Sequence, residues 1–294
     1  MIKVWLRVIR IRFLLASVIA VSVGLAINWN LNNSIDVFAA LMTFVGVVAL
    51  HASVDLLNDY WDYKRGIDTL TKRTKMSGGT GVLPEGLLKP STVYRVGIAF
   101  LIIGGVIGAY FVITDGLVIA IILGFAIFSI YFYSTKIVDS GLAEFFVALK
   151  GAMIVLGTFF IQSNQLTGES VLGGVVVGVL SSLVLFIVSF PDYDADKLKG
   201  RKTLVIAAGK KNATYVFWIF PMISIGAIIS GVLLELFPIS SMISLIPIPL
   251  IILAGRGLQK NYENQDLLFP SMSKTLMFSR LTGTLFVLGI LIDL

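Results

Sequence analysis

Two short acidic segments, NDYWD and DYDAD, carry the side chains best suited to chemistry. The first places Asn58 and Asp62 four residues apart, and the second places Asp192 and Asp196 at the same spacing. Four residues make about one helical turn, so each pair projects from one side of its helix. Carboxylates near hydrocarbon are costly to keep ionised unless a cation lies among them. Oxygen ligands of this kind suit Mg²⁺, and we expect these four residues to bind it.

Basic side chains follow both acidic segments. They are Lys64, Arg65, Lys72, Arg73, Arg201 and Lys202. Arginine and lysine beside a hydrated Mg²⁺ ion form the complement of a polyanion such as diphosphate. We therefore expect a phosphorylated substrate, with Lys64, Arg73, Arg201 and Lys202 among the residues that bind its diphosphate.

The composition indicates which elements position these segments. Hydrophobic residues make up 57% of the 294 residues and charged residues 14%, and the mean hydropathy is +0.94. This is the balance of an integral membrane protein. Continuous apolar stretches favour helices over the alternating strands of a membrane barrel. The sequence predicts about nine transmembrane helices, at approximately 13–30, 35–57, 93–113, 117–134, 141–162, 171–190, 213–234, 240–258 and 274–292.

The basic residues also predict the orientation in the cell membrane. The N-terminus and the loops after the second, fourth, sixth and eighth spans hold almost all 23 Lys and Arg, and the other loops hold none. The positive-inside rule places these segments in the cytoplasm, and an odd number of spans then places the C-terminus outside. The net charge of +6 thus reports topology. We expect no nucleic-acid partner, because the chain has no soluble basic module.

Both acidic segments open long cytoplasmic loops of one predicted transmembrane domain, residues 1–294. These catalytic loops, at about 58–92 and 191–212, each begin with acids and continue into bases. Four predicted spans separate them, which suggests an internal duplication that delivers a carboxylate cluster twice to one membrane face. The GGTG segment lacks the GK[ST] ending of a nucleotide-binding loop, so its glycines indicate a tight turn.

The motifs resemble those of the UbiA superfamily of intramembrane prenyltransferases. NDYWD and DYDAD look like the two aspartate-rich motifs of that family, and the likeness covers almost the whole chain. The other segments that carry it are RIRFL at 10–14, GGTGVLPEGLL at 78–88, GLAE at 141–144, LGTFFIQ at 156–162 and GRKTL at 200–204. NDYWDYKRGIDT and GGTGVLPEGLL look most like the 1,4-dihydroxy-2-naphthoate prenyltransferases of menaquinone biosynthesis.

The resemblance implies an all-α fold of nine membrane helices around a central cavity. It also implies two Mg²⁺ ions, an isoprenyl diphosphate donor of the geranylgeranyl or farnesyl class, and an aromatic acceptor prenylated in the lipid bilayer. The two motif pairs would hold the ions, with Asp59 and Asp68 as further catalytic candidates. The family pattern places an Asp where this chain has Gly66, so Asp68 lies two residues beyond the expected position.

Prenyl transfer gives roles to residues outside the motifs. An allylic carbocation develops as diphosphate leaves, and the ring of Tyr133 can stabilise it. Arg10 and Lys136 are expected to bind diphosphate, and the family often has a Lys four residues after such a Tyr. Here the spacing is three. Glu144 lies inside the fifth predicted span, so we expect it to bind the acceptor or to move a proton.

Two more polar residues lie inside predicted spans. His51, the single histidine, is expected to be a packed, hydrogen-bonded helix residue rather than a catalytic base. Lys150 is expected to pair with Glu144 or with another acid.

The sequence leaves two alternatives open. Within the enzyme class, the acceptor could instead be a hydroxybenzoate or a glycerol-phosphate lipid. In a different class, the acids could bind the coupling cation of a secondary transporter built from repeats. Transport sites usually lie near the membrane midplane, whereas these acids are predicted at helix ends on one face.

Overall fold

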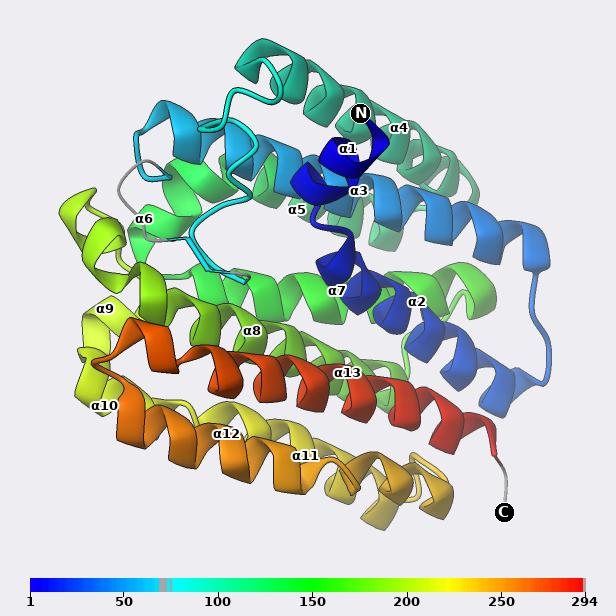
Figure 1. The fold of residues 1–294 in the computed structure, drawn as a ribbon. Helices are drawn as coiled ribbons and strands as arrows, with labels where there is room; N and C mark the ends of the chain where they lie inside the picture. Colours follow the sequence, from blue (N-terminus) through cyan, green and yellow to red (C-terminus); the bar gives the residue numbers. More distant parts are fainter. Residues whose placement is uncertain (69–72, 75, 293–294) are drawn as a thin grey trace.

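The computed structural model describes residues 1–68, 73–74 and 76–292, and this part of the chain forms helices with no strand (Figure 1). Nine helical segments in it are long and apolar enough to cross a membrane, which confirms the predicted fold class. The first four spans are α2 (Ile11–Asn32), α3 (Val37–Lys64), α4 (Pro90–Asp115), and α5 (Leu117–Phe132) continued by the π-helix η1 (Tyr133–Ile137) and α6 (Val138–Ser140). The others are α7 (Ala143–Ser163), α8 (Gly168–Leu198), α10 (Lys210–Val216) with α11 (Ile219–Leu233), η2 (Ile239–Leu245) with α12 (Ile248–Asn261), and η3 (Gln265–Leu267) with α13 (Phe269–Leu291). Two short helices, α1 (Ile2–Val8) and α9 (Leu204–Ala208), lie outside the spans.

Helices α3 and α8 are longer than the sequence predicted. They continue to Lys64 and Leu198, so both acidic motifs lie on the last turns of helices and not in loops. Each helix is capped at its N-terminus. The Asp36 side chain caps the first turn of α3, and Thr167 and Ser170 form a capping box at α8. The motif side chains are therefore positioned by rigid helix rather than by flexible loop.

Small residues allow α7 and α8 to pack closely. A Cβ atom added at Gly174 would lie 3.1 Å from the backbone oxygen of Ala152, and one at Gly178 would collide with the backbone of Ala148. Helix contacts of this kind are favoured in membranes, where dispersion forces between close backbones replace the hydrophobic effect. The contact fixes α7 beside the helix that carries the second motif.

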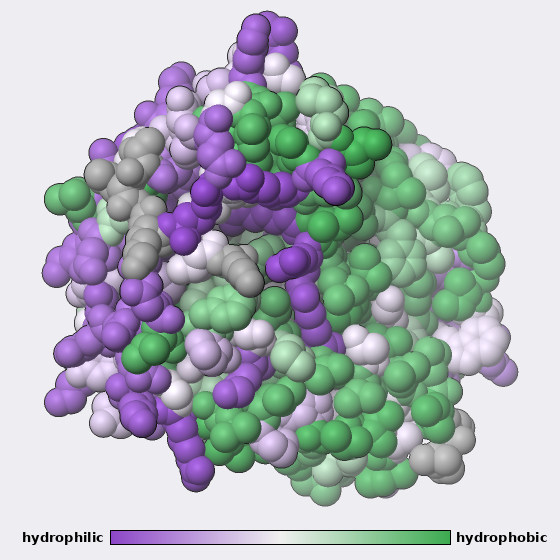
Figure 2. All heavy atoms as spheres, in the orientation of Figure 1, coloured by the Kyte–Doolittle hydropathy of each residue, from purple (hydrophilic) through white to green (hydrophobic). Residues whose placement is uncertain are grey.

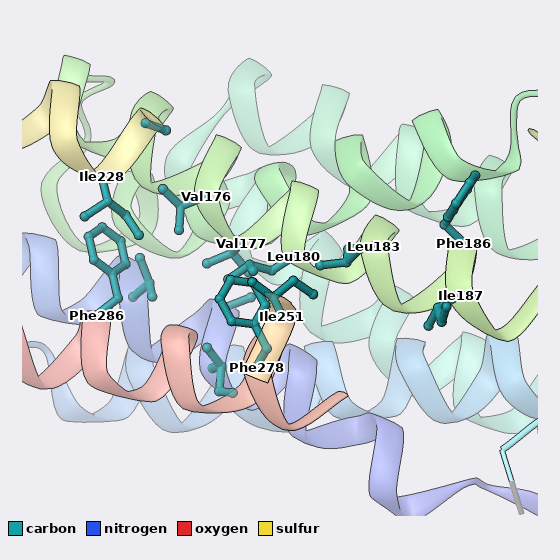
Figure 3. Packing of buried hydrophobic residues seen from close by; sticks show 14 of the residues in the cluster. Val176, Val177, Leu180, Leu183, Phe186, Ile187, Ile228, Ile251, Phe278 and Phe286 are labelled. Carbon is teal, nitrogen blue, oxygen red and sulfur yellow. The ribbon is translucent and has the colours of Figure 1, made fainter. Parts of the chain in front are cut away.

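The main hydrophobic core lies along α8. Figure 3 shows Val177 and Leu180 of α8 beside Phe278 of α13 and Ile251 of α12. One residue earlier on α8, Val176 packs in the same cluster with Ile228 of α11 and Phe286 of α13. This packing holds α8 in the middle of the bundle, where its final turns reach the site.

Polar side chains gather at one end of the bundle. That end lies on the left of Figure 1 and holds α9, α10 and the loop between α3 and α4. In Figure 2 the same side is largely hydrophilic, and apolar residues cover most of the remaining visible surface. Both acidic motifs lie toward this polar end, because α3 and α8 both finish there.

Candidate active site

The two acidic motifs line one cavity of about 250 Å³ between the helices. Asn58 and Asp62 enter it from α3, and Asp192 and Asp196 enter it from α8. Asn58 Nδ2 donates a hydrogen bond of 3.2 Å to Asp62 Oδ2, so the first pair is held together by its own helix. The spacing of four residues therefore places each pair on one helical face, as predicted.

Arg201 joins the two motifs. Its guanidinium forms an ion pair with Asp62 and donates to Asp196 Oδ1 at 3.0 Å. The turn at Gly200, with φ of 80°, brings Arg201 back, and its backbone N–H donates to the Asp196 carbonyl at 2.9 Å. Burial opposes the charge of Arg201, but Asp62 and Asp196 outweigh it and raise the pKa of the guanidinium above its ordinary value. The two motifs thus face each other across one shared cation.

Asp59 anchors the loop between α3 and α4. Its buried carboxylate accepts hydrogen bonds from Thr80 N at 3.0 Å and from Thr80 Oγ1 at 2.7 Å. Arg10, which lines the cavity, lies 3.5 Å from the same carboxylate. Asp59 is not among the cavity-lining residues, so the structure makes it a support for Arg10 and the loop rather than a ligand-facing acid.

The loop closes over the polar end of the cavity. Ser77, Gly78 and Gly79 line the cavity, and Gly78 N donates to Asp192 Oδ2 at 3.3 Å. Gly78 and Gly79 have φ of 79° and 69°, so the glycines do serve a tight turn. This segment lies within the predicted catalytic loop at about 58–92, but the contact of its backbone with Asp192 was not predicted, because a backbone N–H leaves no side-chain signal.

Asp68 also faces the cavity. It is buried, and its Oδ2 atom has no hydrogen-bond partner among the described residues. Burial, reinforced by the nearby charges of Asp62 and Asp59, raises the pKa of Asp68 to about 7. Asp68 therefore reaches the site despite its offset from the family position.

Surface ion pairs hold the outside of the same loop. Arg7 of α1 donates to both Glu85 oxygens, at 2.9 and 2.7 Å, and Arg73 lies 2.5 Å from Glu85 Oε1. Hydrogen bonding from Arg7, with a smaller contribution from Arg73, lowers the pKa of Glu85 to about 2. Arg73 is thus engaged at the surface.

Four basic residues predicted to bind diphosphate do not line the cavity. Lys64, Arg73, Lys136 and Lys202 are all exposed. Lys64 donates to Tyr60 Oη at 3.2 Å and lies over aromatic rings of its own helix. Long cationic side chains near membrane helix ends extend to the polar interface, and sequence spacing does not reveal that direction. Lys72 lies outside the described residues.

The π-helix η1 places Tyr133 at the cavity. Arg65 holds this turn by donating to Ser134 O at 2.5 Å and to Asp139 Oδ1 at 3.0 Å. Ser134 Oγ in turn donates to Asn58 Oδ1 at 2.8 Å, which links the π-helix to the first motif. Isolated π turns inside α-helices occur frequently at functional sites.

Glu144 of α7 lines the cavity and is buried. Its Oε1 accepts a hydrogen bond of 3.1 Å from Leu204 N at the start of α9, and its Oε2 has no partner among the described residues. Arg280 of α13 lines the cavity too, and its buried Nη2 makes no hydrogen bond within the described part of the chain. Arg280 was not predicted from the sequence, although a lone arginine inside an apolar span is itself a signal.

The inner end of the cavity contains a second polar group. His51 Nδ1 lies 2.6 Å from Ser17 Oγ, and His51 Nε2 lies 3.8 Å from Asp55 Oδ2. His51 is therefore hydrogen-bonded, as expected. Lys150 of α7 lines the same region, and no ion pair joins it to Glu144 or to another acid among the described residues.

The motif residues fit Mg²⁺ that is bound together with phosphate. Among the described residues, no three carboxylate or imidazole groups form a ready metal cage. Each motif instead offers a pair of oxygen-bearing side chains, and the buried Asp192 Oδ1 accepts no hydrogen bond from any described residue. Mg²⁺ commonly takes one or two carboxylates and completes its shell with water and substrate phosphates. The oxygen-bearing side chains of the two motifs match this coordination of Mg²⁺.

Comparisons with known proteins identify the family of this chain and several relatives. The model of the UbiA prenyltransferase family matches residues 17–278, which confirms the predicted resemblance. The chain is 28% identical to the 1,4-dihydroxy-2-naphthoate octaprenyltransferase of Bacillus subtilis over 183 residues, which cover 61% of this chain and 58% of that protein. It is 25% identical to the Escherichia coli protein of the same name, over 99% of this chain and 96% of that protein. The naphthoate branch that the motifs suggested is thus represented among its relatives.

The fold matches a solved structure as well. A UbiA homolog from Archaeoglobus fulgidus, bound to DMAPP and Mg²⁺, superposes with a TM-score of 0.65 over 96% of this chain and 98% of that one. The sequences are 16% identical, so this likeness concerns the fold.

Proposed function

The chain belongs to the UbiA prenyltransferase family, and on that premise we propose that it transfers an isoprenyl group from an isoprenyl diphosphate to an aromatic acceptor in the membrane. The donor is of the geranylgeranyl or farnesyl class. The acceptor is a dihydroxynaphthoate, as in menaquinone-type biosynthesis. Because the chain belongs to a family of prenyltransferases, we do not propose the transporter alternative.

One observation carries the proposal. The oxygen-bearing faces of α3 and α8 meet across one cavity and share the guanidinium of Arg201. Two facing pairs of oxygen-bearing side chains, three of them carboxylates, with a buried cation between them match a ligand that carries several negative charges and its metal ions. A solvated helix end would not bury Asp62 and Asp196 in this way.

We assign Asn58 and Asp62 to one Mg²⁺ ion and Asp192 and Asp196 to a second. When bound, Mg²⁺ neutralises charge that builds on the departing diphosphate. The other members of the site come from the chain itself. Arg201 and Arg10 line the cavity and are the cations that bind diphosphate oxygens. The Gly78 N–H and the loop that contains it cover this end.

The remaining residues control the carbocation. Tyr133 presents an aromatic ring to the cavity, and cation–π attraction of about 0.5–2 kcal/mol would stabilise positive charge beside it. The packed apolar walls exclude water, which would otherwise capture the cation as an alcohol. The carbon–oxygen bond of the donor breaks with its electron pair going to diphosphate, and the acceptor ring supplies the pair for the new carbon–carbon bond. The attacked ring carbon then releases the group it carried, as a proton or as carbon dioxide, and that bond's electron pair restores the aromatic ring.

We also propose the orientation and the limits of the domain. The N-terminus and the segments at 58–92 and 191–212 face the cytoplasm, the C-terminus lies outside, and residues 1–294 form one membrane domain. The distribution of Lys and Arg supports this orientation. Cysteine accessibility labelling offers a direct check, because the natural chain has no cysteine.

The function can be tested with purified protein in detergent. Geranylgeranyl or farnesyl diphosphate is supplied with Mg²⁺ and a panel of acceptors: 1,4-dihydroxy-2-naphthoate, 4-hydroxybenzoate and geranylgeranylglyceryl phosphate. Mass spectrometry of the lipid products then identifies the acceptor. We expect Asp62→Ala and Asp192→Ala to reduce turnover by roughly 100-fold or more, since removing even an outer-shell partner of a metal costs about 10- to 100-fold. Near-normal activity of both variants would exclude the assigned metal site.

A further inference from the structure

The inner end of the cavity holds a polar group that the diphosphate site does not use. His51 and Asp55 from α3 and Lys150 from α7 all line the cavity. Asp55 lies seven residues before Asp62 on the same helix, which places it about 10 Å deeper in the membrane. Charged groups at this depth are costly and usually serve a bound ligand or a partner.

Two of these charges lack direct partners in the described part of the chain. Asp55 Oδ2 is buried and makes no hydrogen bond within the described residues, and it lies 3.8 Å from His51 Nε2. Lys150 forms no ion pair with any described acid, although it interacts through space with Asp55. Unsatisfied charge inside a protein costs free energy, and a ligand that satisfies both groups would regain it.

His51 sets the geometry of this group. Ser17 of α2 lies 2.6 Å from His51 Nδ1 and thereby fixes the imidazole ring, so that Nε2 faces Asp55. Three helices, α2, α3 and α7, therefore position one ammonium group and one free carboxylate oxygen at the inner end of the same cavity. The pattern offers a cation and a hydrogen-bond acceptor side by side.

We propose that Lys150 and Asp55, oriented by His51, bind the acceptor through a carboxylate and a neighbouring hydroxyl group on its ring. The Lys150 ammonium pairs with the carboxylate, and Asp55 accepts a hydrogen bond from the hydroxyl. An aromatic ring with these substituents on adjacent carbons presents the complement of both protein groups. This inference rests on the proposed prenyl transfer and adds the acceptor's recognition to it.

The position of the group suits this role. A ring held at Lys150 and Asp55 lies one to two helical turns below the diphosphate-binding motifs, within the same cavity. Nearby walls are apolar and include Ile154 and Val177, which can contact the faces of the ring. The donor and the acceptor then use different side chains.

Comparing three acceptors distinguishes the carboxylate contact from the hydroxyl contact. 1,4-Dihydroxy-2-naphthoate carries both groups, 1,4-dihydroxynaphthalene lacks the carboxylate, and 4-hydroxy-2-naphthoate lacks the adjacent hydroxyl. Affinity is measured by equilibrium binding to the donor-free protein, and kcat/KM by product formation with geranylgeranyl diphosphate and Mg²⁺. We expect the natural protein to prefer the first ring by about 10- to 100-fold, the range for hydrogen bonds that involve charged groups.

Substitutions then assign each contact. Lys150→Met should abolish the preference for the carboxylate, and Asp55→Asn should weaken the preference for the hydroxyl, while the KM of the donor stays unchanged. Lys211→Met makes the same chemical change at an exposed site on α10 that does not line the cavity, and should alter neither preference. Thermal unfolding in detergent confirms that each variant is folded.

Several outcomes would overturn the inference. It fails if Lys150→Met retains the carboxylate preference, if the variant changes the donor's KM instead, or if Arg280→Met alone removes the preference. It also fails if the natural protein binds all three rings equally. Failure of the proposed function is a separate result: the natural protein would then release no diphosphate from the prenyl donor with any acceptor, whatever the binding assay shows.

Discussion

The two ends of the cavity handle buried charge in opposite ways. At the polar end, Asp62 and Asp196 share Arg201, so each acid already has a cation from the chain. At the inner end, Asp55 and Lys150 line the wall without a hydrogen bond or ion pair that joins them among the described residues. These two acids are therefore compensated before substrate arrives, although Asp68 and Asp192 at the same end each keep one oxygen without a hydrogen bond among the described residues. The inner end keeps unpaired groups, which cost stability and remain available to a ligand.

The largest effect should come from removing the shared cation. Arg201→Gln leaves Asp62 and Asp196 buried without compensation, and breaking a buried ion pair in this way costs about 3–5 kcal/mol. Thermal unfolding in detergent would show the loss. Mg²⁺ with diphosphate should restore part of it, because a ligand that binds the native state stabilises that state. An unchanged unfolding midpoint would mean that the two ends do not differ as described.

Loss of a loop anchor should have an intermediate effect. Thr80→Val removes the hydroxyl that donates to the buried Asp59, at a cost of about 1–3 kcal/mol. Thr80→Ser keeps the hydroxyl and serves as the matched control. Hydrogen exchange of residues 77–83 should increase in the valine variant and stay unchanged in the serine variant. Equal exchange in both would remove Asp59 from its supporting role.

A smaller effect of opposite sign is expected at the inner end. Lys150→Met replaces a cation that has no ion-pair partner among the described residues by an apolar side chain of similar length. Because burying a charge without an ion-pair partner costs free energy, this replacement should be neutral or slightly stabilising. The unfolding midpoint should therefore stay constant or rise, even though acceptor recognition is lost. A large fall in the unfolding midpoint would show that Lys150 stabilises the fold. In that case Lys150 and Arg201 would not differ in the way described.

The smallest effect concerns the surface of the loop. Glu85 has a pKa lowered to about 2 by Arg7 and Arg73, so its contribution is complete above the ordinary carboxyl pKa of 4.5 and disappears as the pH falls toward 2. Glu85→Gln should remove this pH dependence and slightly loosen α1. The rate of proteolysis of the loop, compared at pH 7 and pH 3.5, measures this pH dependence. The exposed pair is screened by solvent, so the change in stability should be slight.

More of the site residues at the polar end than at the inner end could be predicted from the sequence. Asn58, Asp62, Asp192 and Asp196 were visible because polar oxygen-bearing pairs at a spacing of four, twice in one chain, stand out against apolar spans. Asp55 lies on the same helical stripe as the first motif, but Lys150 comes from another helix, and only the packing of α3 beside α7 brings the two to one wall. Their joint chemistry depends on that packing.

The basic residues show a second limit. The sequence placed Lys64 and Lys202 beside the acids correctly, but proximity along the chain says nothing about direction, and both side chains turn to the surface. Arg201 differs because the turn at Gly200 returns it toward α8. Its inward direction comes from backbone geometry, which a count of charges cannot supply. The nine spans were predictable because bilayer thickness sets their length.

The π-helix at Tyr133–Ile137 has a consequence for how this protein can be altered. A turn of this kind accommodates one more residue than a regular helical turn, so deleting a single residue there could restore α geometry without breaking the span. Every side chain beyond the deletion would then rotate by about 100° about the helix axis. Asp139 would swing away from Arg65, and the link from α5 to the first motif would be severed while the bundle stayed whole. The extra residue of the π-helix thus keeps this side of the cavity aligned with the first motif.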